Sequence, residues 1–153
     1  MQKISLLLAV ITFFILASCK QIAGASIENS VEDLNEKCPI KLGKVDVLNK
    51  VEYRNNAICF YVTEDEDEAD ISQLSTQEKE RIENSMEFKR QAIGMCFAND
   101  IVQKELNNLT ETMADEVALT FKVFIKGATS KGVLKTELSW REIQDLKSAA
   151  SEW

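Results

Sequence analysis

The stretch 51-VEYRNNAICFYV-62 contains two runs of alternating side chains on either side of a pair of asparagines. Apolar residues recur at every second position in both runs, which is the period of β-strands. Asparagine tolerates the positive φ angles of a two-residue turn, so Asn55 and Asn56 predict a β-hairpin. The predicted register pairs Tyr53 with Ile58, Val51 with Phe60 and Glu52 with Cys59. The apolar side chains then share one face, which supports the hairpin.

We extend the first strand of this hairpin back to Val45, and we expect Val45 and Val47 on the face of Val51 and Tyr53. The run 117-VALTFKVFIK-126 predicts a third strand, and 133-VLKTELSW-140 returns from it after the loop 127-GATSKG-132. With that loop, the predicted pairs are Ile125 with Leu134, Phe121 with Leu138, Leu119 with Trp140, and Lys122 with Glu137 on the opposite face.

Helices are predicted from apolar spacing and from capping residues. Ser26 should begin a short helix with Ile27, Val31 and Leu34 on one face, and Pro39 limits it. Three capping-box patterns open further helices, namely Ser75 with Glu78, Asp100 with Gln103, and Ser139 with Glu142. The first of these helices should run to about Phe97 with a stripe at Ile82, Met86, Ile93 and Phe97, and a second line at Phe88, Ala92 and Met95. The next carries Val102, Leu106, Leu109 and Met113, and the last Ile143, Leu146, Ala150 and Trp153.

The predicted fold class is α+β, with the element order α-ββ-α-α-ββ-α. Two hairpins that each have one apolar face should form an antiparallel four-stranded sheet with the helices on one side. A chain of 153 residues with one proline and five glycines indicates a single domain, which we place at residues 27–153.

Residues 1–18 have the features of an export signal. The apolar run 4-ISLLLAVITFFIL-16 has the length of a signal-peptide core and is shorter than the roughly 20 residues of a membrane-spanning helix. The sequence 16-LASC-19 that follows resembles the lipobox of bacterial lipoproteins. This resemblance implies cleavage before Cys19, acylation of Cys19, and a short tether over residues 19–26.

The resemblance also implies a membrane-anchored protein of the bacterial cell envelope, expected on the outer membrane and facing the periplasm. The alternative is cleavage at the A-x-A site 23-AGA-25, which would release a soluble periplasmic protein after Ala25. The chain that follows, including 34-LNEKCP-39, is similar to small exported bacterial domains, and that resemblance implies no activity.

Charge and composition argue against several functions. Lys3 is the only charged residue before Cys19, so the remaining chain is one unit more negative than the −7 of the whole sequence, which disfavours nucleic acid as a partner. There is no histidine for a catalytic pair or a metal site. The spacing of Cys38, Cys59 and Cys96 matches no zinc finger. The acidic run over residues 64–70 lacks an EF-hand pattern and is read as a solvated loop. We expect no cofactor, no metal and no catalytic residue.

The leading functional hypothesis is therefore an envelope-anchored accessory module that binds another exported protein. One alternative is an inhibitor or immunity-type protein for a basic enzyme, based on the acidic charge. The other is a glycan-directed hydrolase that uses paired carboxylates.

The face of the sheet away from the helices is the candidate binding surface. We single out Tyr61 and Phe124, together with Lys122 and Glu137, because aromatic side chains in a polar surround are typical of binding hot spots. Cys59 should lie on this face and Cys96 on the buried side of its helix, so no bridge between these two is expected. Pairing of Cys38 with Cys96 stays open.

Overall fold

The fold is described from a computed structural model, which defines the backbone of residues 2–64, 71–127 and 132–150, and side chains within these ranges from residue 19 to residue 145. The elements, in chain order, are α1 (Gln2–Asn35), β1 (Ile40–Lys41), β2 (Asp46–Arg54), β3 (Ala57–Glu64), the 3₁₀ helix η1 (Ile71–Gln73), α2 (Thr76–Glu83), α3 (Met86–Phe97), α4 (Asp100–Leu106), α5 (Glu111–Val117), β4 (Thr120–Gly127), β5 (Val133–Ser139) and α6 (Trp140–Ala150). The acidic run 65–70 and the loop 128–131 lie outside the described residues.

Both predicted hairpins are present with the predicted registers. Asn55 and Asn56 have φ angles of 51° and 58°, as a type I′ turn requires. In the first hairpin Tyr53 pairs with Ile58, Val51 with Phe60 and Glu52 with Cys59. In the second, Phe121 pairs with Leu138, Ile125 with Leu134 and Lys122 with Glu137, and the Trp140 N–H donates to the Leu119 carbonyl at 3.2 Å.

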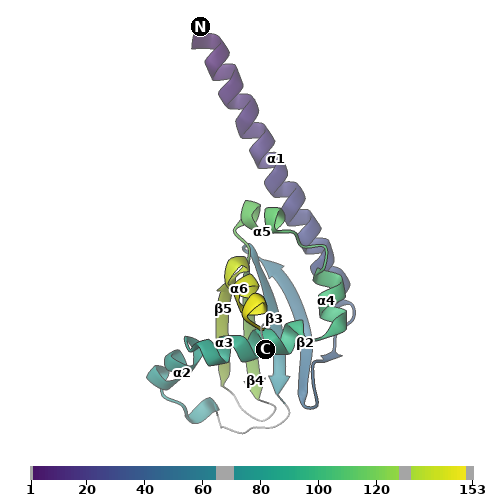
Figure 1. The fold of residues 1–153 in the computed structure, drawn as a ribbon, viewed down its shortest axis with the longest axis vertical. Coiled ribbons are helices and arrows are strands. Elements are labelled where there is room, and N and C mark those ends of the chain that lie inside the picture. Colours follow the sequence, from purple (N-terminus) through teal and green to yellow (C-terminus); the bar gives the residue numbers. More distant parts are fainter. Residues whose placement is uncertain (1, 65–70, 128–131, 151–153) are drawn as a thin grey trace.

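The predicted antiparallel four-stranded sheet is wrong in two respects. The sheet has five strands in the order β1-β2-β3-β4-β5, and β3 pairs with β4 in parallel, from Ala57 with Thr120 to Glu64 with Gly127 (Figure 1). Parallel neighbours need a long crossover connection, and helices α2 to α5 provide it. The hairpin registers alone do not determine which strands of the two hairpins become neighbours.

The expected placement of Val47 is also wrong, because β2 is irregular. The register shifts between Leu48 and Lys50, so that Leu48 pairs with Val62 and is fully buried, whereas Val47 pairs with Thr63 and is half-buried. The extra residue, Asn49, donates from Nδ2 to Thr63 Oγ1 at 2.7 Å. A bulge of this kind reverses the alternation along a strand.

Helix α1 does not begin at Ser26, as predicted, because it runs without a break from Gln2 to Asn35. The expected apolar face is present, and Ile27, Val31 and Leu34 are at most 2% exposed. Ala23, within the predicted tether, is also buried. The last turns of α1 pack beside β2, and the N-terminal half extends beyond the sheet (Figure 1).

The segment 75–97 forms two helices instead of the one predicted. The capping box of Ser75 and Glu78 is confirmed, but α2 ends at Glu83, and the Ser85 hydroxyl accepts from the Phe88 N–H to begin α3. The continuous stripe concealed this break because Ile82 and Ile93 both pack towards the core, whereas Met86 is 55% exposed. Ser85 is itself a favourable N-cap residue.

The other predicted helix starts are confirmed only in part. Asn99, not Asp100, caps α4, because its Oδ1 accepts from the N–H groups of Ile101 and Val102. Gln103 donates to the Phe97 carbonyl instead of closing a capping box. Val102 and Leu106 are buried in α4, and Leu109 and Met113 lie beyond its end. Val117 ends α5 instead of beginning β4, and Ala118 is left-handed with φ 51°.

The capping box of Ser139 and Glu142 opens α6 as predicted, with Ser139 N–H to Glu142 Oε2 at 2.7 Å. Ile143 is fully buried, and the other residues predicted for that face of α6 have no described side chains. The core lies between the sheet and the helices and centres on Phe60, Phe97 and Phe121. Trp140 stacks on Phe121 with ring centroids 5.8 Å apart.

Candidate functional site

The face of the sheet opposite the core carries the predicted aromatic pair. Tyr61 on β3 and Phe124 on β4 are partners in the parallel register. Their rings stack with centroids 5.1 Å apart and planes 9° from parallel, and both side chains are half-buried. Offset stacking contributes about 0.5–1.5 kcal/mol beyond burial, so the pair forms a rigid apolar centre on this face.

Polar groups surround that pair in a connected network. The Tyr61 hydroxyl donates to Glu52 Oε2 at 2.9 Å, and Lys50 pairs with the same carboxylate. The hydrogen bonds from Lys50 and then Tyr61 lower the pKa of Glu52. Burial, followed by the hydrogen bond to Glu52, raises the pKa of Tyr61. The carboxylate therefore stays ionised and holds the tyrosine hydroxyl as a donor.

The other two predicted residues, Lys122 and Glu137, lie one row further along the sheet. They form an ion pair at 3.2 Å across β4 and β5, as the register predicts. The structure thus brings Tyr61 and Phe124 into direct contact and places the ion pair beside them as part of the same face.

Cys59 lies on the same face of the sheet but is only 1% exposed, so it is not available at the surface as expected. The Cys59 side chain, followed by Tyr61, raises the pKa of Arg54. Cys96 is buried in the core, and burial raises its pKa to about 12. All four cysteines, Cys38 included, are free thiols.

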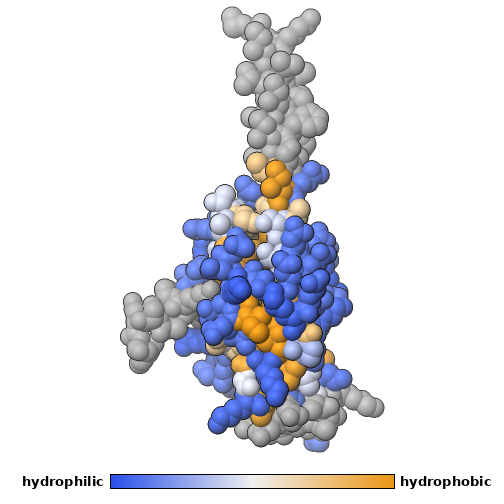
Figure 2. All heavy atoms as spheres, turned by 90° about the vertical axis from the view of Figure 1, so that its right-hand side faces the viewer, coloured by the Kyte–Doolittle hydropathy of each residue, from blue (hydrophilic) through white to orange (hydrophobic). Residues whose placement is uncertain are grey.

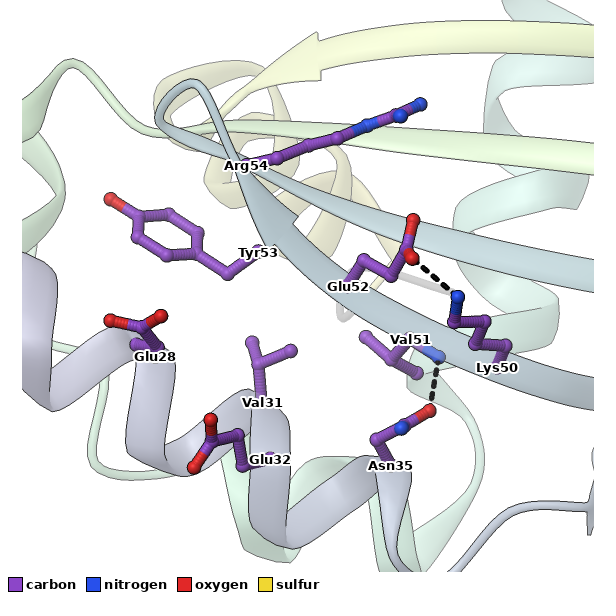
Figure 3. A pocket seen from close by; sticks show the side chains of 9 residues that line it. All are labelled: Glu28, Val31, Glu32, Asn35, Lys50, Val51, Glu52, Tyr53 and Arg54. Carbon is purple, nitrogen blue, oxygen red and sulfur yellow. Dashed lines mark hydrogen bonds and ion pairs between the residues drawn. The ribbon is translucent and has the colours of Figure 1, made fainter.

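A second feature, which the sequence reasoning missed, is an open groove beside β2. Strand β1 covers only Val47 and Leu48, so no strand of the described residues lies beside the edge of β2 from Lys50 to Arg54. The groove has a volume of about 350 Å³ and lies between this edge and α1 (Figure 3). Its lining residues are Glu28, Val31, Glu32, Asn35, Lys50, Val51, Glu52, Tyr53 and Arg54.

Helix α1 presents a polar stripe to this groove. Glu28, Glu32 and Asn35 follow each other at helical spacing, next to the buried stripe that begins at Ile27. Burial, followed by the charge of Glu28, raises the pKa of Tyr53. The polar stripe beside the apolar one was the sequence signal for this groove, but only the position of β2 shows that the stripe faces an open strand edge.

The opposite edge of the sheet has a comparable groove of about 360 Å³ between β5 and the junction of α2 with α3. There the Glu83 carboxylate accepts from the backbone N–H of Lys135 at 2.9 Å, so a helix side chain covers part of this edge. Lys122, Phe124 and Glu137 also line this groove, which joins the predicted face to the β5 edge.

The surface on the side where α1, α4 and β2 lie is mostly polar, with a smaller apolar area at its centre (Figure 2). Among the residues whose side chains are described, no group of three metal-ligating side chains comes together. Within the same part of the chain, no helix has the length and apolar content needed to cross a membrane.

The fold, but not the sequence, has similarity to solved structures. No protein-family model matches the chain, and no curated protein sequence matches it significantly. The pilotin EpsS of the Vibrio vulnificus type 2 secretion system matches with a TM-score of 0.51 over 84% of this chain and 97% of that chain. The fold resembles that of a pilotin. Sequence identity in this comparison is 9%, so the likeness concerns the fold alone.

A second structure, that of a candidate secreted protein from Pseudomonas aeruginosa, covers 82% of this chain and 96% of that chain. Its TM-score is 0.47 and its sequence identity is 7%. In the comparison with the pilotin, the matched region covers most of this chain and nearly the whole of that chain.

Proposed function

We propose that this chain is a lipoprotein of the bacterial envelope whose domain is a non-catalytic binding module for another exported protein. In this proposal residues 1–18 are the signal peptide, Cys19 carries the lipid, and residues 27–153 form the binding domain. Support for the anchor comes from the sequence 16-LASC-19 directly after the apolar run. Support for an accessory role in secretion comes from the fold likeness to a pilotin.

The observation that carries the binding proposal is the Tyr61–Phe124 stack on the sheet face opposite the core, where both side chains are half-buried. A rigid aromatic pair within a ring of charged side chains has the composition of an interface hot spot. The surrounding charges are already paired within the protein, so a partner that buries the aromatic centre leaves few of them without a partner.

The anchor is tested by replacing Cys19 with serine and growing cells with a radioactive fatty acid. We expect the Cys19→Ser variant to lose both the label and its fractionation with membranes. Labelling that persists in this variant would exclude Cys19 as the lipid-bearing residue, and label lost without any change in fractionation would exclude the lipid as the anchor.

Binding is tested by affinity capture of the full anchored chain from its own envelope, followed by mass spectrometry and titration of the purified partner. The double variant Tyr61→Ala/Phe124→Ala should bind this partner at least 30-fold more weakly, since hot-spot residues contribute about 2 kcal/mol or more each. Ile101→Ala is the matched control, because Ile101 is an exposed apolar side chain on α4, a helix that packs against α1 and α3. Binding lost with the control and kept by the double variant would assign the interface to the helices.

A further inference from the structure

The backbone groups on the edge of β2 at the α1 groove have no strand partner among the described residues. In an antiparallel ladder, successive residues direct their N–H and C=O groups alternately towards and away from the neighbouring strand. The Val51 N–H bonds to a side chain on α1, so it points away from β3, and the same alternation directs the backbone groups of Tyr53 away from β3. β1 covers this edge only at Val47 and Leu48.

Asn35 occupies the position that a further strand would take. Its Oδ1 accepts the Val51 N–H at 2.9 Å, which is the bond that the backbone carbonyl of an added strand would make (Figure 3). The Asn35 side chain is half-buried and belongs to the last residue of α1. The edge therefore has a replaceable acceptor in place of a permanent strand.

The charge of the groove determines which extended segments could pair with the β2 edge. Glu28 and Glu32 are exposed and form no ion pair with any described residue, whereas Lys50 already pairs with Glu52. The Arg54 side chain extends away from α1 in Figure 3. The α1 wall of the groove is thus negative and needs basic side chains opposite it. A second copy of this chain would bring two such acidic walls together, so self-pairing at this edge is disfavoured.

We propose, on the basis of the binding function proposed above, that the β2 edge takes up an extended segment of the exported partner as a sixth strand, with lysine or arginine at alternate positions facing Glu28 and Glu32. Side chains between these basic residues point to the outer face and extend the surface around Tyr61. Strand addition gives affinity through the backbone and specificity through every second side chain.

The test uses the full chain in detergent and a fluorescent, capped peptide of about eight residues, the length of a typical strand, in which lysine and valine alternate. We expect saturable binding and slower amide hydrogen exchange at Val51 and Tyr53. The same peptide methylated at every backbone nitrogen should not bind, because it cannot donate to β2. Equal binding of the methylated peptide, or unchanged exchange at both residues, would overturn strand addition.

Three variants separate the roles of charge and of Asn35. The double variant Glu28→Gln/Glu32→Gln should bind the peptide about tenfold more weakly at low salt. Its control is Glu111→Gln/Asp115→Asn, which removes two exposed carboxylates with the same spacing on α5. This control should leave the affinity for the peptide unchanged. Asn35→Ala removes the competing acceptor and should tighten binding roughly three- to tenfold. Weaker binding by Asn35→Ala, or an equal loss with the α5 pair, would contradict the proposed site.

Failure of this inference can be told apart from failure of the proposed function. If the wild-type chain captures an exported partner but neither binds the peptide nor loses that partner in the Glu28→Gln/Glu32→Gln variant, the strand-addition site is wrong and the binding function stands. If the peptide protects Val51 and Tyr53 but the chain captures no exported protein, the site is supported and the proposed function falls.

Discussion

Gly132, directly before β5, lies too close to Ile71 to accept any side chain. A Cβ at this position would lie 2.6 Å from Ile71 Cγ2, 2.9 Å from Ile71 Cβ and 2.8 Å from the Ile71 backbone carbonyl carbon. The backbone of Gly132 is not left-handed, so steric overlap alone should decide the effect of Gly132→Ala. Overpacking of this kind typically costs about 1–3 kcal/mol, against a total stability of about 5–15 kcal/mol.

Gly94 provides a matched control with the opposite expected sign. It lies within α3 and is exposed, and apart from its chain neighbours and the backbone of its own helix, no atom lies within 4 Å of the position of an added Cβ. Gly94→Ala should therefore stabilise the protein by about 0.5–1 kcal/mol, since alanine loses less backbone entropy in a helix. Urea unfolding of the full chain in detergent, followed by tryptophan fluorescence, measures both changes. The corresponding shifts in Tm are about −2 to −12 °C for Gly132→Ala and +1 to +4 °C for Gly94→Ala.

A Gly132→Ala variant within about 0.5 kcal/mol of wild type would refute the described approach of η1 to β5, since that value is the scatter of neutral surface substitutions. A second substitution tests the geometry more closely. Ile71→Ala removes the Cγ2 atom but leaves the backbone carbonyl carbon 2.8 Å from the Cβ added at position 132. The double variant Ile71→Ala/Gly132→Ala should therefore recover only part of the stability that Gly132→Ala loses. Complete relief would mean that the backbones are farther apart than described.

Two further predictions concern the core and a helix end. The pKa of Cys96 is raised to about 12 by burial, so between its ordinary value of 9.0 and that pH the folded thiol keeps a proton that the unfolded one loses. The free energy of unfolding should therefore fall as the pH rises above 9, by up to about 1.4 kcal/mol per pH unit from this thiol. Cys96→Ala should lack this contribution, which should therefore appear as a slope in the difference between the wild-type and variant curves. Ala118 is exposed and has a left-handed backbone conformation, which glycine adopts at lower cost than alanine. Ala118→Gly should therefore raise the free energy of unfolding by about 0.5–1 kcal/mol. An unchanged or lower value would contradict the described end of α5.

Short-range features could be predicted from the sequence because they depend on residues close together in the chain. The turn at Asn55 and Asn56 determines the first hairpin, and the capping boxes at Ser75 and Ser139 mark two helix starts. The aromatic pair on the outer face also follows from strand alternation, since Tyr61 and Phe124 occupy outward positions in both registers.

The features that sequence reasoning missed depend on contacts between distant segments. The two-residue strand β1 has no periodicity to detect, and the parallel pairing of β3 with β4 is set by how the intervening helices cross the sheet. The apolar stripe over residues 82–97 continues through the break before Ser85 because both helices pack on one core. Predicting the groove at β2 would have required knowing that Glu28 and Glu32 lie beside an unpaired strand edge. No local sequence pattern specifies that arrangement.

The parallel pairing at the centre of the sheet has a consequence for how the chain acquires its structure. The partners Ala57 and Thr120 are roughly sixty residues apart, so the central ladder has a high contact order and its formation requires closure of a long loop. A chain that emerges into a new compartment from its N-terminus can form the first hairpin early. It then presents β3 as an unpaired, apolar edge until β4 arrives in the last quarter of the sequence. During that interval the nascent chain is most exposed to aggregation and proteolysis, and a chaperone that shields an extended apolar strand would act on this intermediate and not on the finished domain.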